Sequence, residues 1–195
     1  NEPGDVVVVV RGPEKNFMVR KKEKVAGVWV NVDRMKFFNM PGFYALAASK
    51  PLSLMEQSAI LKQLQIGNAQ LFSPPENGPA LERYNEYSQA FLAYQFKRKL
   101  FLPEPAPLEF MGETLFKTTV EFPDTIPPGH YTAEIYLLSG GAVAGMQAMP
   151  ITVSKIGVDA ALFDFAHGSP ALYGFTAIAL ALAAGWLASR LLQKL

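Results

Sequence analysis

One uncharged stretch near the C-terminus decides how this chain is built: Gly168-Ser-Pro-Ala-Leu-Tyr-Gly-Phe-Thr-Ala-Ile-Ala-Leu-Ala-Leu-Ala-Ala-Gly-Trp-Leu-Ala-Ser189. Its length of about 22 residues corresponds to about 33 Å of α-helix, which matches a hydrocarbon core of about 30 Å. We therefore predict a transmembrane helix over residues 168–192. About 165 residues remain ahead of it, enough for one folded domain.

Charges on either side of the predicted helix indicate its orientation. Arg190 and Lys194 follow the apolar part, whereas Asp159 and Asp164 precede it. Because basic flanks stay on the cytoplasmic side, we expect a single-pass inner-membrane protein with a periplasmic N-terminal domain and a cytoplasmic C-terminus. A tail-anchored cytoplasmic domain is the alternative topology. Residues 157–167 are expected to form a juxtamembrane helix on the bilayer surface.

Composition excludes several classes of function. The net charge is +1, which gives no bulk attraction to nucleic acid. The sequence has no cysteine and two histidines, which excludes disulfides, thiolate metal sites and a cysteine nucleophile. It also lacks common catalytic and nucleotide-binding motifs, such as Gly-x-Ser-x-Gly and the P-loop. We therefore expect a protein without enzymatic activity, metal or cofactor.

The chain ahead of the helix has the pattern of a mainly β domain. Val6–Val10 is an unbroken run of valines, as in a strand that is covered on both faces. Other alternating or apolar segments predict further strands, at residues 17–20, 26–32, 35–38, 43–48, 116–122, 131–137 and 142–153. We place turns at residues 21–24 and 139–141. We also expect a signal peptide and the first strands of the domain to lie ahead of residue 1.

A helical insertion over about residues 51–101 interrupts these strands. Ser53 and Glu56 fit the capping box of a first helix over residues 52–64, and Gly67 is a suitable stop. A second helix over about residues 80–101 carries an aromatic face, formed by Tyr84, Tyr87, Phe91 and Tyr94. We expect this face to pack on the sheet, and a ligand pocket lined by its rings is the alternative.

Together these elements predict an Ig-like β-sandwich over residues 1–156 with an inserted helical pair. Gly129-His-Tyr131 at the start of a strand has the form of a tyrosine corner, in which the hydroxyl binds nearby backbone.

Four segments are similar to a known family. The resemblance rests on Gly4-Asp-Val-Val-Val-Val-Val-Arg-Gly-Pro13, Gly27-Val-Trp-Val-Asn31, Phe43-Tyr-Ala-Leu-Ala-Ala48 and Phe122-Pro-Asp-Thr-Ile-Pro-Pro-Gly-His-Tyr-Thr-Ala-Glu-Ile-Tyr-Leu-Leu138. Together with the C-terminal helix, they resemble the putative transmembrane protein family of alphaproteobacteria. The resemblance implies a signal peptide and two or three strands ahead of the Val-rich strand. It implies no catalytic residues, and it suggests an association with sulfite-exporter-like permeases.

The predicted transmembrane helix carries a row of small residues four positions apart: Ala177, Ala181, Gly185 and Ser189. Such a row lets a second helix approach closely in lipid. We therefore predict that these residues pack against a helix of a second copy or of another membrane protein. A chance row in an alanine-rich helix is the alternative interpretation.

A second candidate site is the Met146-x-x-Met149 pair, since thioethers bind Cu(I) and His130 can supply a further ligand. Residues three apart in a strand point to opposite faces, which favours ordinary packing. Ordinary surface roles are expected for the basic clusters at residues 21–24 and 97–99, for Glu82 and Glu86, and for His167.

The sequence thus predicts a non-catalytic, membrane-anchored accessory or interaction protein that serves a transporter such as a sulfite-exporter-like permease. Its expected partners are the lipid bilayer and a membrane protein or a second copy, and not nucleic acid. A periplasmic module that binds copper or another ligand is the alternative. A carboxylate-based glycosidase is a more distant rival.

Overall fold

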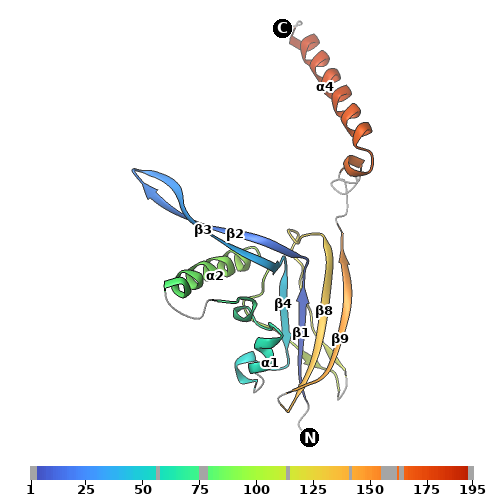
Figure 1. Ribbon diagram of the computed structural model, residues 1–195. Helices are drawn as coiled ribbons and strands as arrows, with labels where there is room; N and C mark the ends of the chain where they lie inside the picture. Colours follow the sequence, from blue (N-terminus) through green and yellow to red (C-terminus); the bar gives the residue numbers. More distant parts are fainter. Residues whose placement is uncertain are drawn as a thin grey trace. The chain divides into compact units, whose positions relative to one another are not determined.

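A five-stranded sheet forms the centre of the N-terminal part of the chain (Figure 1). The computed structural model describes residues 4–55, 58–74, 79–112, 115–140, 142–154, 162 and 165–192. Within the sheet the strand order is β5-β4-β1-β8-β9. All neighbouring pairs are antiparallel except β4 with β5. The strands are β1 (Asp5–Arg11), β4 (Tyr44–Ala48), β5 (Ala106–Pro107), β8 (Gly129–Ser139) and β9 (Ala142–Val153).

Strand β1 lies in the middle of the sheet and is buried on both faces. Its five valines, Val6–Val10, are each at most 7% exposed. Val7 and Val9 belong to the large core cluster, whereas Val6 and Val8 belong to a second, smaller cluster. Because alternate side chains of a strand point to opposite faces, Val7 and Val9 are covered on one side of the sheet and Val6 and Val8 on the other. The prediction from the valine run is confirmed.

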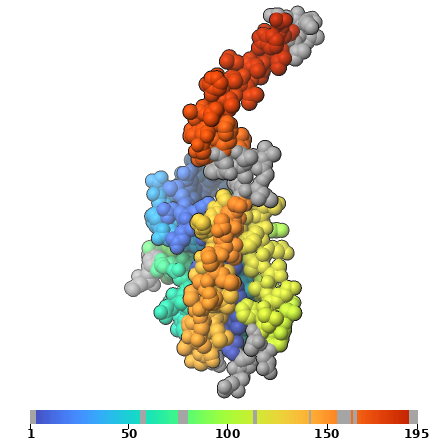
Figure 2. Space-filling model, turned by 90° about the vertical axis from the view of Figure 1, so that its right-hand side faces the viewer, coloured from blue at the N-terminus to red at the C-terminus, as the bar shows by residue number. Residues whose placement is uncertain are grey.

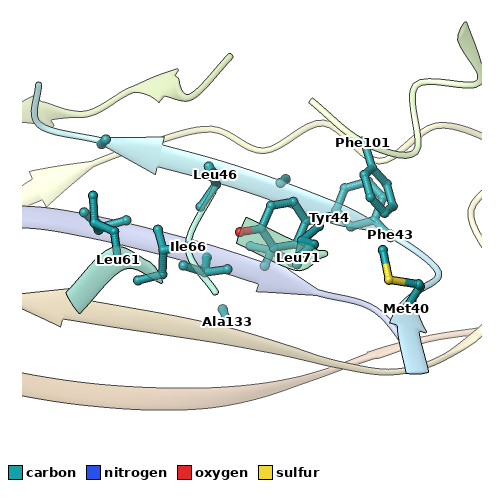
Figure 3. Packing of buried hydrophobic residues seen from close by; sticks show 14 of the residues in the cluster. Met40, Phe43, Tyr44, Leu46, Leu61, Ile66, Leu71, Phe101 and Ala133 are labelled. Atoms are coloured by element: carbon teal, nitrogen blue, oxygen red, sulfur yellow. The ribbon is translucent and has the colours of Figure 1, made fainter. Parts of the chain in front are cut away.

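Two different segments supply the cover. On the face of Val7 and Val9, Leu61 and Ile66 lie over β4 and β1 (Figure 3). Leu61 belongs to α1 (Ser58–Gln63), and Ile66 follows it. Helix α1 lies between the 3-10 helices Leu52–Leu54 and Ala69–Leu71. On the other face, Leu108 and Phe116 pack against Val6 and Val8. Leu108 precedes β6 (Glu109–Phe110), and Phe116 is the first residue of β7 (Phe116–Lys117). Strands β6 and β7 form a short hairpin.

A second antiparallel pair, β2 (Glu14–Val25) and β3 (Val28–Pro41), forms a long hairpin outside the main sheet. Helix α2 (Pro79–Lys97) packs against the base of this hairpin. The ring of Phe91 lies 5.1 Å from that of Phe17 on β2 and 5.6 Å from that of Phe37 on β3. Tyr84, Tyr87 and Phe91 therefore serve packing, as expected, whereas Tyr94 is 57% exposed. The ring partners include the hairpin, where we had expected the main sheet.

The turn of this hairpin corrects a prediction. Ala26 and Gly27 both have positive φ angles, 49° and 88°. Two consecutive residues with positive φ are typical of the two-residue turn whose twist matches that of the strands. The expected turn at residues 21–24 is wrong, because those residues continue β2. The strand predicted over residues 26–32 instead begins at Val28.

Three further predictions need correction. The strand expected over residues 116–122 is limited to Phe116–Lys117. The first helix is not continuous over residues 52–64, because Met55 has extended backbone with ψ 125°; Glu56 of the expected capping box lies outside the described residues. The second helix ends at Lys97 and not at residue 101, since Lys99 turns into the left-handed region with φ 56°.

The expected Ig-like sandwich is not confirmed. The described residues of this part form one five-stranded sheet and two separate two-stranded sheets. A sandwich would need a larger second sheet that includes β2 and β3, whereas these two strands form a two-stranded sheet of their own. The tyrosine corner is nevertheless present, because the Tyr131 hydroxyl donates a hydrogen bond to the carbonyl of Pro127. The strands expected ahead of residue 1 stay a prediction.

The chain divides into two compact units, Asn1–Val153 and Ser154–Leu195. The second unit contains α4 (Pro170–Leu192), which matches the predicted transmembrane helix. Residues Pro170–Arg190 form a helix of 21 residues that is long and apolar enough to cross a membrane, and none of it is buried within the protein. Most of the juxtamembrane helix expected at residues 157–167 lies outside the described residues.

A bidentate ion pair joins the hairpin to α2. Arg83 donates from Nε to Asp33 Oδ2 at 2.8 Å and from Nη2 to Oδ1 at 2.6 Å. These bonds favour the charged carboxylate, so they lower the pKa of Asp33 from 3.8 to about 2. Lys21 and Glu86 form a second ion pair between the two elements, at 2.7 Å.

We predict that Arg83→Met raises the pKa of Asp33 toward 3.8. A lowered pKa stabilises the folded state above the unfolded-state pKa and loses that effect as pH falls through the folded-state value. The contribution of this pair should therefore disappear between about pH 4 and pH 2 in the parent protein. Carboxyl NMR titration of the full chain measures the pKa. Arg98→Met, which removes an exposed arginine just beyond the opposite end of α2, should leave it low; an unchanged pKa in Arg83→Met would contradict this assignment.

Candidate functional site

The predicted packing row on α4 forms an open surface. Ala177, Ala181, Gly185 and Ser189 are all exposed. They succeed one another at i, i+4 spacing, so they lie along one face of the helix. A Cβ atom built on Gly185 would meet nothing within 4 Å. The row thus presents accessible backbone to its surroundings, which is the geometry that close helix packing in a bilayer needs.

Polar groups on α4 are arranged as a membrane-spanning helix requires. The Thr176 hydroxyl donates to the carbonyls of Leu172 and Tyr173, at 3.0 and 2.9 Å. The donor is therefore satisfied inside the helix, without water. Near the C-terminal end, the Arg190 guanidinium lies 5.0 Å from the Trp186 ring centroid. Tyr173 and Trp186 stand toward opposite ends of the helix, as expected for aromatic residues at the two interfaces.

Strand β9 offers a second open surface, at the edge of the main sheet. In the described part of the chain, its only strand partner is β8. Its sequence from Ala142 to Val153 contains no charged residue, and Val143, Met146 and Met149 are exposed. Figure 2 shows the strand, in orange, running uncovered along the surface. Long edge strands without charge are templates for pairing with another strand.

The copper ligands considered from the sequence are not brought together. Met146 pairs with Tyr136 and Met149 with Ala133, so the two thioethers leave opposite faces of the sheet. His130 lies on the face of Met146 but six residues along β8 from Tyr136, a separation of about 20 Å. Among the described residues, no group of three or more His, Cys, Asp and Glu side chains could hold a metal ion.

A cavity of about 800 Å³ lies between the end of the main sheet and the base of the hairpin. Charged residues from both sides line it: Arg11, Glu14, Lys36 and Glu134, together with His130. The lining carries both signs of charge.

Arg11 organises one wall of this cavity. Its Nη2 donates to the carbonyls of Leu64 and Gln65, at 2.8 and 3.1 Å, and its Nε donates to Glu134 Oε2 at 3.2 Å. The guanidinium also lies 5.3 Å from the Tyr44 ring centroid. All three of its directed contacts are with the protein itself, so the side chain fastens the segment after α1 to the sheet.

Tyr44 also attaches the segment after α1 to the sheet. Its hydroxyl donates to the Gln65 carbonyl at 3.1 Å and accepts from the Gly67 amide at 2.9 Å. Burial disfavours the phenolate and raises the pKa of Tyr44 to about 12. Gln65 has a φ of 53°, a conformation that costs energy for a non-glycine residue. The two donors to its carbonyl explain how it is held there.

Sequence reasoning missed this network, although its signals are visible. Arg11 ends the valine run abruptly, and Thr132, Glu134 and Tyr136 alternate with the apolar residues of β8. The pattern identifies a polar face of β8. Only the pairing of Arg11 with Thr132 shows that this face meets Arg11.

The other charged residues considered from the sequence lie on the surface. Lys21 and Glu86 pair with each other. Arg98 lies 5.7 Å from the ring of Tyr94, just beyond the end of α2.

An apolar helix with an exposed surface, following a folded β-rich unit, defines a membrane-anchored protein, with one candidate span among the described residues. A family model described as "Putative transmembrane protein" (Alph_Pro_TM) matches residues 1–194. The chain belongs to this family, which confirms the resemblance seen in its sequence. Neither the curated proteins nor the solved structures contain a significant match.

We predict that Arg11→Met lowers the free energy of unfolding by about 2–3 kcal/mol, because it leaves Glu134 and two carbonyls without their charged donor. Denaturant unfolding of the full chain in detergent, followed by circular dichroism, measures the loss. Arg20→Met removes an exposed arginine from β2 and should change the stability by less than about 0.5 kcal/mol. Equal effects of the two substitutions would show that the Arg11 network does not stabilise the fold.

Proposed function

We propose that this protein is a non-catalytic, membrane-anchored accessory protein that holds a partner protein beside the bilayer. The observation that carries the proposal is strand β9. A free edge without charge is open to pairing with another strand, and in β9 a register irregularity opposite Leu137 and Leu138 and the proline Pro150 limit the uninterrupted part of this edge to Gly145–Met149. A partner strand that pairs with β9 would satisfy its outward backbone groups.

The small-residue row of α4 supports a second contact with the partner, inside the bilayer. Lipid gives no hydrophobic drive for helix association, so close packing of small residues is the main source of affinity there. Two weak contacts on one tethered chain reinforce each other, because the first raises the effective concentration for the second.

For the setting of this complex, we propose the inner membrane with the N-terminal unit in the periplasm. The basic residues Arg190 and Lys194 at the C-terminal end of α4 support a cytoplasmic C-terminus. A transporter such as a sulfite-exporter-like permease is the proposed partner, on the family resemblance.

The proposal predicts that two sets of substitutions reduce partner recovery when the full chain is purified from its native membrane in mild detergent. Met146→Lys with Met149→Lys places charges on the β9 edge and should weaken strand pairing. Ala177→Leu with Ala181→Leu fills the small-residue row and should block close helix approach. Quantitative mass spectrometry of the co-purified membrane proteins measures both effects.

Matched controls separate these effects from a general change in the surface. Met111→Lys adds a lysine at another exposed methionine, and Ala179→Leu with Ala183→Leu adds the same bulk to the opposite face of α4. Both controls should retain the partner. If the parent protein purifies without any membrane protein, or if controls and test variants behave alike, the accessory function is wrong.

A second candidate function, a periplasmic ligand-binding module, is favoured by the cavity of about 800 Å³. Arg11, Lys36 and His130 in its lining make a small oxyanion the suitable probe. A ligand that binds only the folded state raises its stability, by about 2.7 kcal/mol at 100 times its Kd. Titration with sulfite and with sulfate should therefore raise the melting temperature of the full chain if this function is correct, and an unchanged melting temperature removes it for these anions.

A further inference from the structure

The tip of the β2–β3 hairpin is an apolar surface that the rest of its unit leaves uncovered. Residues 22–32 are exposed without interruption. Val28 is 64% exposed and Trp29 is 66% exposed, values that are unusual for such side chains in a water-soluble hairpin. Figure 1 shows the tip extending beyond α2. The ion pairs of Lys21 and Asp33 with α2 hold the hairpin just before this segment begins.

The strand register divides the tip into two different faces. Val25 pairs with Val28, and Lys24 pairs with Trp29. Because side chains alternate along each strand, one face presents valines at positions 25, 28 and 30 together with Glu23, which pairs with Val30. The other face presents Trp29 between the lysines at positions 22 and 24. A tryptophan beside lysines, with valines on the opposite face next to the turn, is a combination suited to a membrane–water interface.

We propose that this tip rests in the headgroup region of the bilayer that holds the protein's own anchor. Val25 and Val28, next to the turn, would enter the outer part of the apolar layer. Trp29 and Glu23 would lie at the interface, and Lys22 and Lys24 would bind anionic headgroups. Basic residues close to an anionic bilayer surface are attracted to it. This inference is independent of the proposed accessory function and requires only that α4 spans the membrane.

The course of the chain within the N-terminal unit makes this contact reachable. Val153, the last residue before the connection to α4, pairs with Gly129. Gly129 lies against Pro13, since a Cβ built on it would be 3.0 Å from Pro13 Cγ, and the hairpin starts at Glu14. The chain therefore leaves toward its anchor at the end of the sheet where the hairpin begins.

The lengths involved are compatible with the contact. From Glu14 to Val25 the hairpin measures about 36 Å, at about 3.3 Å per residue. The connection between Val153 and Pro170 has about 16 residues; residues 165–168 are helical, so the connection spans at most about 48 Å. A tether longer than the hairpin allows the tip to reach the surface. Since the anchor keeps the tip close to the bilayer at all times, a weak interfacial affinity is sufficient.

The experiment follows Trp29 in the full chain reconstituted in lipid nanodiscs. Trp186→Phe leaves Trp29 as the single tryptophan, because the sequence has two. Discs of phosphatidylcholine with phosphatidylglycerol, with and without brominated acyl chains, report contact between the indole and the acyl region. We expect quenching of Trp29 by the brominated lipids and a blue-shifted emission relative to the protein in detergent.

Charge reversal tests the role of the lysines. Lys22→Glu with Lys24→Glu should abolish the quenching in anionic discs, whereas Lys97→Glu with Lys117→Glu, at exposed positions elsewhere, should preserve it. Absence of quenching in the parent, while the protein still migrates with the disc through α4, would overturn the proposal. A blue shift that appears only when other solubilised membrane proteins are added would overturn it too, because the tip would then bind a protein. Loss of the protein from the disc fraction would mean that the anchor itself does not span, and the inference falls with it.

Discussion

Burial of β1 on both faces is the constraint on which the N-terminal unit depends. A strand of five valines between β4 and β8 must be shielded from water on two sides. The segment around α1 covers one side and the segment with Leu108 covers the other. Arg11 marks the end of the valine run and fastens the first cover through two backbone carbonyls. These hydrogen bonds hold the covering segment over the apolar core, and the burial of that core supplies most of the free energy of folding.

Among the apolar surfaces that the described residues expose, three lie outside these two covers. These are the edge strand β9, the hairpin tip around Trp29 and the whole surface of α4. Contiguous exposed apolar surfaces generally mark sites of contact with proteins or membranes. In the described part of the chain, α4 is the one helix long and apolar enough to cross a bilayer. For the other two surfaces we propose a partner protein and the bilayer surface.

Sequence patterns predicted an element correctly where the physical cause of that element lies within one segment of the chain. The valine run, the alternation of β8 and the long apolar stretch of α4 are each properties of one segment, and all three elements are present as predicted. The hairpin turn at Ala26–Gly27 was missed because the flanking valines look like a continuous strand, although Gly27 carried the signal of a turn. The sandwich was inferred from strand number alone, and pairing partners are a long-range property. For the same reason Arg11 and Glu134, 123 residues apart, could not be joined before the register of β1 and β8 was known. The small-residue row was readable because it lies on one helix, and its role stays a prediction.

The central claim of this account is that the uncovered edge of β9 faces a partner in the native membrane. The most direct measurement is site-specific photo-crosslinking in intact cells, with a photoreactive residue at position 146 on β9 and, for comparison, at position 111 on the loop after β6. The account predicts a crosslink to one defined membrane protein from position 146 and none from position 111. A chain that stays uncrosslinked at both positions, although it is folded and inserted in the membrane, would contradict it.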